Sequence, residues 1–303
     1  MTGPDTDFPK EPAGRRDNPA LGILMMVAAI GFLSSMNLFI KLIGPDYHPM
    51  QVTFLRNLVA AAVILPFILR IGGAAVLKTR RPWMHGARAL GGILGNACYF
   101  YAFARLPLAD VMVISQAVPL FATALAVVFL NERVGWRRWT AIVVGFGGVA
   151  VAIDPTGAVS TASLVTVVAT VFWASTILLM RSLGATESPY TVVFYYMAAG
   201  TVMAGLFMPW VWATPPLEVL GFFVAAGVLG ALGQYFMTHA LKVAEASVVS
   251  PFNYTAIVWG LLFDLAVWSI WPSWPTVIGA IIISAAGLYL FRREAGLKRR
   301  AGS

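Results

Sequence analysis

Ten long apolar segments, separated by short polar loops, fill almost the whole of this chain. Of its 303 residues, 59% are hydrophobic and 11% are charged, whereas soluble globular chains carry about 25% charged residues. A helix needs about 20 apolar residues to cross the hydrocarbon core of a bilayer. The segments therefore predict ten transmembrane helices, at roughly residues 20–43, 50–71, 85–104, 108–130, 140–153, 164–183, 190–210, 217–241, 247–268 and 275–291.

A pattern of small and polar residues occurs twice inside these segments, half a chain apart. Gly-Ile-Leu-Gly-Asn at 92–96 returns at 230–234 as Gly-Ala-Leu-Gly-Gln. Phe-x-x-Ser-x-x-Leu at 32–38 returns at 172–178, with nearly the same offset. Similar offsets in a common order indicate an internal repeat of five segments. Because five is odd, the second copy must enter the membrane from the opposite side, as in many secondary transporters.

The expected fold is therefore an all-α integral membrane protein made of two inverted five-helix repeats. The expected parts are an N-terminal tail at 1–19, the first repeat at 20–154, the second repeat at 160–291 and a basic tail at 292–303.

The positions of the basic residues predict the orientation of the chain in the membrane. If the N-terminus is cytoplasmic, Lys41, Arg56 and Arg105 are the only Lys or Arg that fall away from the cytoplasmic side. This distribution follows the positive-inside rule, and an even number of spans then places both termini in the cytoplasm. The expected location is the plasma (inner) membrane. The net charge of +8 is thereby explained without a nucleic-acid partner.

Polar side chains within the apolar segments mark candidate positions for a substrate site. An unpaired amide is costly in hydrocarbon, so Asn96 and Gln234 should face either a neighbouring helix or a water-filled cavity. Both interpretations stay open, while the glycines beside them favour close helix packing. The candidate substrate-binding residues are Asn37, Asn96, Tyr99, Ser115, Gln116, Trp173, Gln234, His239, Asn253 and Tyr254.

Two prolines lie inside the apolar segments, Pro119 in the first half and Pro251 in the second. Each removes a helical hydrogen bond, so it bends or opens its helix. The exposed backbone can act as a hinge, or the bend can be a packing kink.

Few charges fall inside the segments. Lys41 lies near the outer end of the first segment, where it can snorkel to the surface. Arg56 lies about 9 Å into the second segment at 1.5 Å per residue, too deep to remain without a partner. Asp264 lies about one turn from the outer end of the ninth segment, on the same side as Arg56. We expect Asp264 either to pair with Arg56, the favoured alternative, or to titrate during transport.

The chain lacks the motifs of several other functional classes. It contains no P-loop, no His-Glu-x-x-His and no paired cysteines, so we expect no bound metal or cofactor. A membrane enzyme would need clustered reactive side chains at one interface, whereas His239 and Asp264 lie in separate segments. The expectation is that the protein is not an enzyme.

The pattern resembles the ten-span EamA-type branch of the drug/metabolite transporter superfamily. The resemblance covers almost the entire chain and is carried by residues 109–119, 129–133, 139–141 and 246–255 and by Arg56. One departure is the absence of a carboxylate at Ser269 or Ile270, where the family often has one. The resemblance implies a secondary or facilitative transporter that exports small metabolites, amino acids first, by alternating access. The alternative is uptake or exchange of a nucleotide-like or adenosyl metabolite.

The expected partners are the lipid bilayer and a small solute, in a monomer or homodimer. Inside the segments, Lys41 and Arg56 face Asp264 alone, which favours neutral, zwitterionic or anionic solutes over cations; we expect a neutral or zwitterionic one.

Overall fold

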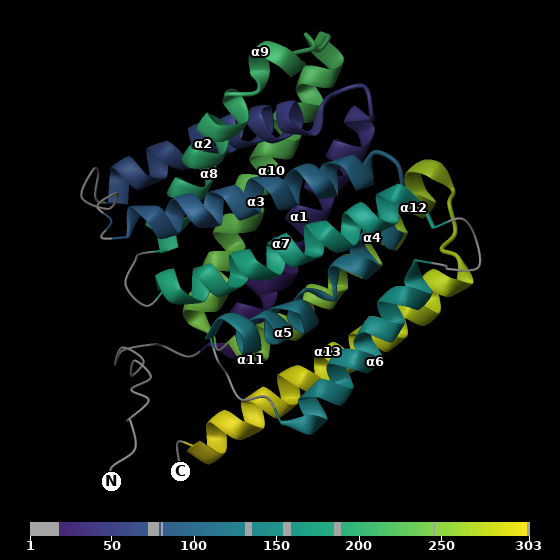
Figure 1. Ribbon diagram of the computed structural model, residues 1–303. Helices are drawn as coiled ribbons and strands as arrows, with labels where there is room; N and C mark the ends of the chain where they lie inside the picture. The colour runs from purple at the N-terminus through teal and green to yellow at the C-terminus, as the bar shows by residue number, and fades with distance from the viewer. Residues whose placement is uncertain are drawn as a thin grey trace.

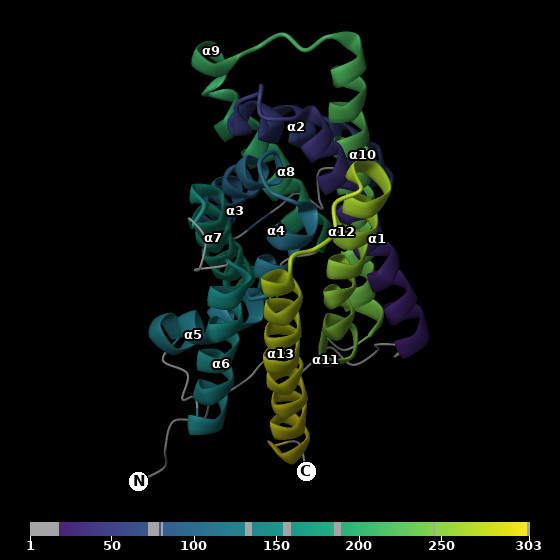
Figure 2. The same cartoon turned by 90° about the vertical axis from the view of Figure 1, so that its right-hand side faces the viewer.

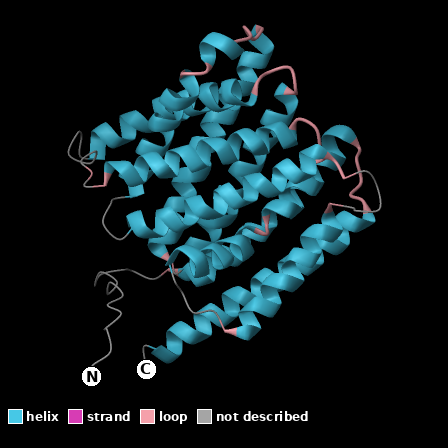
Figure 3. Ribbon diagram, viewed as in Figure 1, coloured by secondary structure: helices cyan, strands magenta, loops and turns pink. Residues whose placement is uncertain are grey.

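The computed structural model describes residues 18–71, 79, 81–130, 135–153, 159–184, 189–244 and 246–301. Most of the expected N-terminal tail lies outside these ranges. The described residues form helices and no strand (Figure 3). The helices are α1 (Pro19–Ile43), α2 (Pro49–Ile71), α3 (Pro82–Phe103), α4 (Leu108–Ser115), α5 (Val118–Leu130), α6 (Trp136–Ala152), α7 (Thr161–Gly184), α8 (Pro189–Gly205), α9 (Met208–Val211), α10 (Leu217–Val243), α11 (Ala246–Val249), the 3-10 helix η2 (Ser250–Tyr254), α12 (Thr255–Trp268) and α13 (Trp274–Ala301).

The length and hydropathy of these helices confirm the membrane assignment. Six helical stretches among the described residues are long and apolar enough to cross a bilayer: Pro19–Ile43, Pro49–Arg70, Leu108–Val127, Thr161–Leu179, Leu217–Ala240 and Trp274–Arg293. The other four expected segments form α3, α6, α8 and α12, which do not meet both conditions. The chain is thus a multi-pass, all-helical membrane protein.

Local chemistry explains where several helices begin and end. Asn18 caps α1, because its side-chain oxygen accepts a hydrogen bond of 3.0 Å from the Leu21 N–H, and Pro19 follows at the first helical position, which suits its fixed φ. The helix ends at Gly44, whose φ of +80° favours a residue without a side chain.

The helices that contain the two prolines are interrupted, as the sequence predicts. The fourth expected segment is divided at Gln116 and Ala117 into α4 and α5, and Pro119 is the second residue of α5. The ninth expected segment is divided into α11, η2 and α12, with Pro251 inside η2. Both breaks occur at corresponding places in the two halves of the chain.

The two halves of the chain are interleaved rather than separate. Closely packed helix pairs include α1 with α10, α3 with α7, α6 with α13, α2 with α8, and α4 with α12. Each of these pairs joins a helix from residues 18–153 to one from residues 159–301. Figures 1 and 2 show α6 and α13 side by side along one edge, with α1 and α10 adjacent elsewhere in the bundle. The interior is therefore shared by both halves.

Candidate functional site

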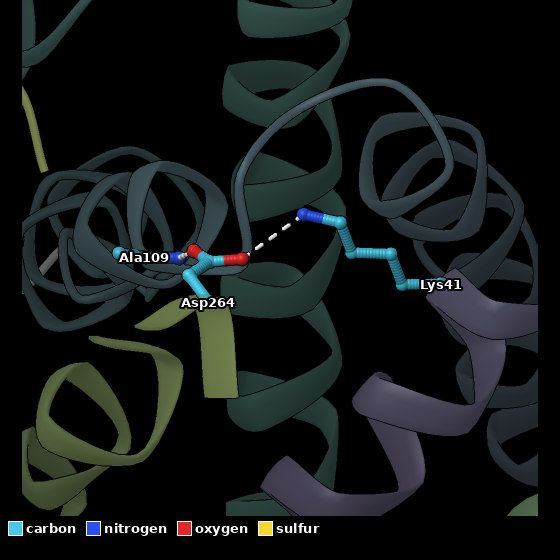
Figure 4. Close-up of polar contacts among 3 residues, drawn as sticks. All are labelled: Lys41, Ala109 and Asp264. Carbon is cyan, nitrogen blue, oxygen red and sulfur yellow. Dashed lines mark hydrogen bonds and ion pairs between the residues drawn. The ribbon is translucent and has the colours of Figure 1, made fainter. Parts of the chain in front are cut away.

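A buried carboxylate ties three helices together near the start of α4. Asp264 on α12 is 1% exposed, and its Oδ1 lies 3.0 Å from Nζ of Lys41 on α1. Its other oxygen accepts a hydrogen bond of 2.8 Å from the backbone N–H of Ala109 on α4. Figure 4 shows the carboxylate between these two partners. Asp264 thus caps the first turn of α4 from another helix while it neutralises a lysine.

The favoured pairing of Asp264 with Arg56 is therefore wrong. Asp264 packs where α12 meets α4 and α1, whereas Arg56 on α2 faces α10 and α8. Placement on the same side of the membrane could not distinguish these locations. Lys41 likewise does not snorkel outward: its side chain is only 12% exposed, and its ammonium group also lies 4.4 Å from the ring centroid of Trp268.

A second carboxylate lies next to the ion pair of Asp264 and Lys41. Asp110, in the first turn of α4, accepts a hydrogen bond of 2.7 Å from the Thr276 hydroxyl on α13. Asp264 and Lys41 both lie within electrostatic range of it. The N-terminal turn of α4 is consequently held by α12 and α13 at once.

A second polar cluster centres on Tyr196 of α8, which is 2% exposed. Its hydroxyl accepts a hydrogen bond of 2.8 Å from Asn96 on α3. The guanidinium carbon of Arg88, two turns earlier on α3, lies 4.5 Å from its ring centroid, within cation–π range. Arg56 on α2 also interacts with the Tyr196 side chain. One tyrosine thus links an amide and two cations from different helices.

Arg56 is accommodated by the second copy of the repeated motif. A methyl group at Gly230 on α10 would lie 3.0 Å from Nη2 of Arg56, so the absence of a side chain there leaves room for the guanidinium group. Arg56 donates a hydrogen bond of 3.1 Å to Oδ1 of Asn57. Gly92, the equivalent glycine on α3, faces the ring of Tyr196 in the same way. The packing interpretation of these two glycines is confirmed.

Charges are segregated between the two clusters. Asp110 and Asp264 gather around Lys41. Arg56 and Arg88 are each 2% exposed, and within the described ranges neither has a carboxylate partner. The cluster around Tyr196 is therefore cationic, whereas two carboxylates share one lysine around Asp264.

Other expected site residues surround the Tyr196 cluster. Trp173 on α7 packs against the apolar groups that contain Tyr99 and Tyr196. The Tyr99 hydroxyl lies 3.1 Å from the hydroxyl of Thr170. Gln234 is 7% exposed and lies one turn after Gly230 on the same face of α10. Its pairing with Asn96 as equivalent amides stays a prediction.

The expected residues at the helix breaks have varied surroundings. The Ser115 hydroxyl donates to the Met112 carbonyl at 2.7 Å, which helps to satisfy the end of α4, and Gln116 is 9% exposed. Asn253 is half-buried within η2. Tyr254 packs with its hydroxyl against Gly287 of α13, so it contributes to a helix contact there.

Asn37 and His239 lie away from the hydrogen-bonded core of the site. Asn37 is half-buried on α1, one residue after Met36, whose sulfur lies beside Gly230. The His239 ring stacks on Tyr235 at 4.4 Å between centroids, and its Nδ1 lies 3.3 Å from the Tyr235 carbonyl oxygen. This contact is within α10, since Tyr235 precedes His239 by one turn.

Sequence reasoning missed Arg88 and Tyr196. Arg88 lies inside the expected third segment at 85–104, but it was counted with the basic residues of the preceding cytoplasmic loop; in the structure it lies within α3 and is buried. Tyr196 has no signal of its own in an apolar segment, except that it follows Arg56 at the offset that separates the two Phe-x-x-Ser-x-x-Leu copies. No group of three or more His, Cys, Asp or Glu that could hold a metal occurs in the part of the chain that the structure describes.

Comparison with known proteins identifies the family. The EamA-like transporter family matches twice, over residues 20–153 and 160–292. The chain belongs to this family. A solved structure shares the fold, with a TM-score of 0.64 at 19% identity, over 90% of this chain and 98% of that chain.

Similar family members are named for different solutes. An S-adenosylmethionine uptake transporter of Rickettsia felis is 29% identical over 274 residues, covering 90% of this chain and 93% of the relative. The pseudopaline exporter CntI of Pseudomonas aeruginosa is 30% identical, covering 91% and 97%. A riboflavin transporter of Rhizobium johnstonii is 31% identical, covering 78% of each chain. The protein is thus a metabolite transporter by family, and these names do not support amino acid export in particular.

Proposed function

We propose that this protein is a secondary transporter that moves a small polar metabolite across the plasma membrane by alternating access between two inverted five-helix halves. The observation that carries this proposal is the pattern of helix contacts. At the offset of the sequence repeat, α1 corresponds to α7, α2 to α8, α3 to α10 and α6 to α13. The contact of α1 with α10 then corresponds to that of α7 with α3, and α10 with α2 to α3 with α8.

The interrupted helices support the same mechanism. The breaks between α4 and α5 and around η2 occur at equivalent places in the two halves, and α4 packs against α12. In transporters built from inverted repeats, discontinuous helices form the substrate site near the midplane, and one half rocks against the other. Pro119 and Pro251 would serve as hinges, with Asn96 and Gln234 lining the site. Both termini would be cytoplasmic, as the distribution of basic residues predicts.

We take S-adenosylmethionine as the first candidate solute, because relatives that align over nine-tenths of this chain are named for its uptake. This choice agrees with the adenosyl alternative from the sequence. The engaged carboxylates argue differently. S-adenosylmethionine carries an ammonium and a sulfonium group against one carboxylate, so it is a net cation, whereas an interior whose clear carboxylates are engaged by Lys41, Ala109 and Thr276 suits a neutral or zwitterionic solute such as riboflavin.

Counterflow in proteoliposomes tests the proposal. Vesicles that contain the purified protein and unlabelled S-adenosylmethionine should accumulate the labelled compound transiently and saturably, whereas protein-free vesicles should not. The same vesicles are then loaded with riboflavin or with single amino acids. Exchange of amino acids alone would favour the amino acid solutes that the sequence resemblance implies first. Linear, non-saturating flux of every solute would point to a channel and overturn the proposal.

A further inference from the structure

Two buried guanidinium groups in the membrane interior lack an acidic partner among the described residues. Arg56 and Arg88 are each 2% exposed, and their hydrogen-bond acceptors, Asn57 Oδ1 and the Val192 carbonyl oxygen, are neutral. Within the same part of the chain, the Nε atom of each arginine has no hydrogen-bond partner. An unpaired charge within a membrane protein is costly and marks a functional position by default.

The geometry around Arg56 keeps the guanidinium group in place without neutralising it. Gly230 leaves space for the group, and Tyr196 contacts it from α8. Arg88 lies over the face of the same tyrosine ring. Since a guanidinium group presents a planar fork of donors, its unmet hydrogen-bonding capacity matches the two oxygens of a carboxylate or a phosphate.

Two buried amides lie beside this cluster. Asn96 and Gln234 are each 7% exposed, and Asn96 is bonded directly to Tyr196. A solute would therefore reach the guanidinium groups when the two halves move apart during the transport cycle. The acids that could compete with such a molecule, Asp110 and Asp264, are engaged elsewhere.

We propose that Arg56 binds an oxyanion group of the transported solute, a carboxylate or a phosphate. Arg88 is a positioning residue that acts through Tyr196. That the bound solute is also transported rests on the proposed function, whereas binding to Arg56 can be measured separately.

Two matched pairs of probes isolate the oxyanion. S-adenosylmethionine carries a carboxylate that decarboxylated S-adenosylmethionine lacks, and riboflavin 5′-phosphate carries a phosphate that riboflavin lacks. Dissociation constants are measured by titration calorimetry on the purified full-length protein in lipid nanodiscs. We expect the oxyanion-bearing member of one pair to bind about tenfold or more tightly, the effect of a charge-assisted contact. The pair that shows the difference identifies the group as carboxylate or phosphate.

Variants of Arg56 and Arg88 test whether these residues cause the difference in affinity within a probe pair. Arg56→Gln should reduce the discrimination to less than about threefold while leaving the affinity for riboflavin, which is uncharged, unchanged. Decarboxylated S-adenosylmethionine is a dication, so the loss of the Arg56 charge should not weaken its binding. Arg56→Lys, which keeps the charge but loses the planar fork, should retain part of it and guards against misfolding of Arg56→Gln. Arg88→Gln should weaken discrimination less, and Arg88→Lys should restore part of it through the cation–π contact. Arg105→Gln, which removes an exposed cation, is the matched control and should change nothing.

Equal binding, or no binding, of both members of both pairs to the wild-type protein overturns the inference. Full discrimination in Arg56→Gln or Arg56→Lys does so as well. If discrimination depends on Arg56 but no solute undergoes counterflow, the oxyanion site stands and the transport proposal fails.

Discussion

Asn96 Nδ2 donates a hydrogen bond of 2.8 Å to the hydroxyl of Tyr196, across the interface of α3 and α8. The two residues come from opposite halves of the chain, so this contact connects the halves, and Ala231 of the second motif copy packs in the same cluster as Tyr196. Removing the hydroxyl leaves a 7%-exposed amide without this acceptor.

Tyr196→Phe should therefore lower the free energy of unfolding by about 1–3 kcal/mol, the cost of an unsatisfied buried polar group. Tyr99→Phe is the matched comparison: Thr170 loses its contact with the Tyr99 hydroxyl but keeps its own hydrogen bond to the Thr166 carbonyl. We expect Tyr99→Phe to lower the free energy of unfolding by less than Tyr196→Phe does. Thermal unfolding of both variants in the same detergent measures the difference. A reversed order would contradict the assignment of Asn96 to Tyr196.

Asp264→Asn should destabilise the protein because it leaves Lys41 uncompensated and weakens the cap on α4. Breaking a buried ion pair by removing one partner costs about 3–5 kcal/mol, and the slight exposure of Lys41 places this case near the lower end. The double variant Lys41→Met with Asp264→Asn should be more stable than Asp264→Asn alone. Additive losses in this double-mutant cycle would show that the two groups do not interact.

Transport by Asp264→Asn also tests whether this carboxylate titrates during the cycle. If it serves as a structural tie, the rate falls but its dependence on pH keeps the wild-type shape. If it exchanges protons, the pH dependence of counterflow changes shape in the variant. The two results separate the remaining interpretations of Asp264.

Gly92→Ala should be destabilising by about 1–3 kcal/mol, because the added methyl group overlaps the buried ring of Tyr196. Gly86 lies on the same helix with no neighbouring atom within 4 Å of an added methyl group. Gly86→Ala should therefore be neutral or slightly stabilising, as helix propensity favours alanine over glycine. Similar unfolding temperatures for the two variants would refute the close contact.

Pro119→Ala should reduce the maximal transport rate while leaving the half-saturating solute concentration almost unchanged. The substitution supplies an N–H that can bond to the Ser115 carbonyl and join α4 to α5. Pro66→Ala is the control, since Pro66 lies inside α2 with an exposed side chain and away from both breaks. Equal rates for wild type and Pro119→Ala would remove the hinge role.

Hydropathy predicted the helical membrane fold and the two prolines predicted the interrupted helices, because both depend on properties that are local in the sequence. The partner of Asp264 could not be predicted in this way. Lys41 and Arg56 lie on the same expected side of the membrane, and only the packing of α12 against α1 and α4 selects Lys41. Arg88 was missed for a related reason: it lies close to the start of the expected segment at 85–104 and was counted as a loop charge, and only the packing of α3 against α8 shows that it is buried.

The side chains that lie beside Gly230 and Gly92, the equivalent glycines of the two halves, differ in charge. Arg56 faces Gly230, and Tyr196, at the equivalent position of the second half, faces Gly92. The space beside one glycine thus holds a cation, and the space beside its equivalent in the other half holds an uncharged aromatic ring. The two halves match the same family model, but the side chains at these equivalent positions differ in charge. The oxyanion proposed above would therefore be held beside Gly230 on α10, and the equivalent position beside Gly92 on α3 would not offer a second site of the same kind.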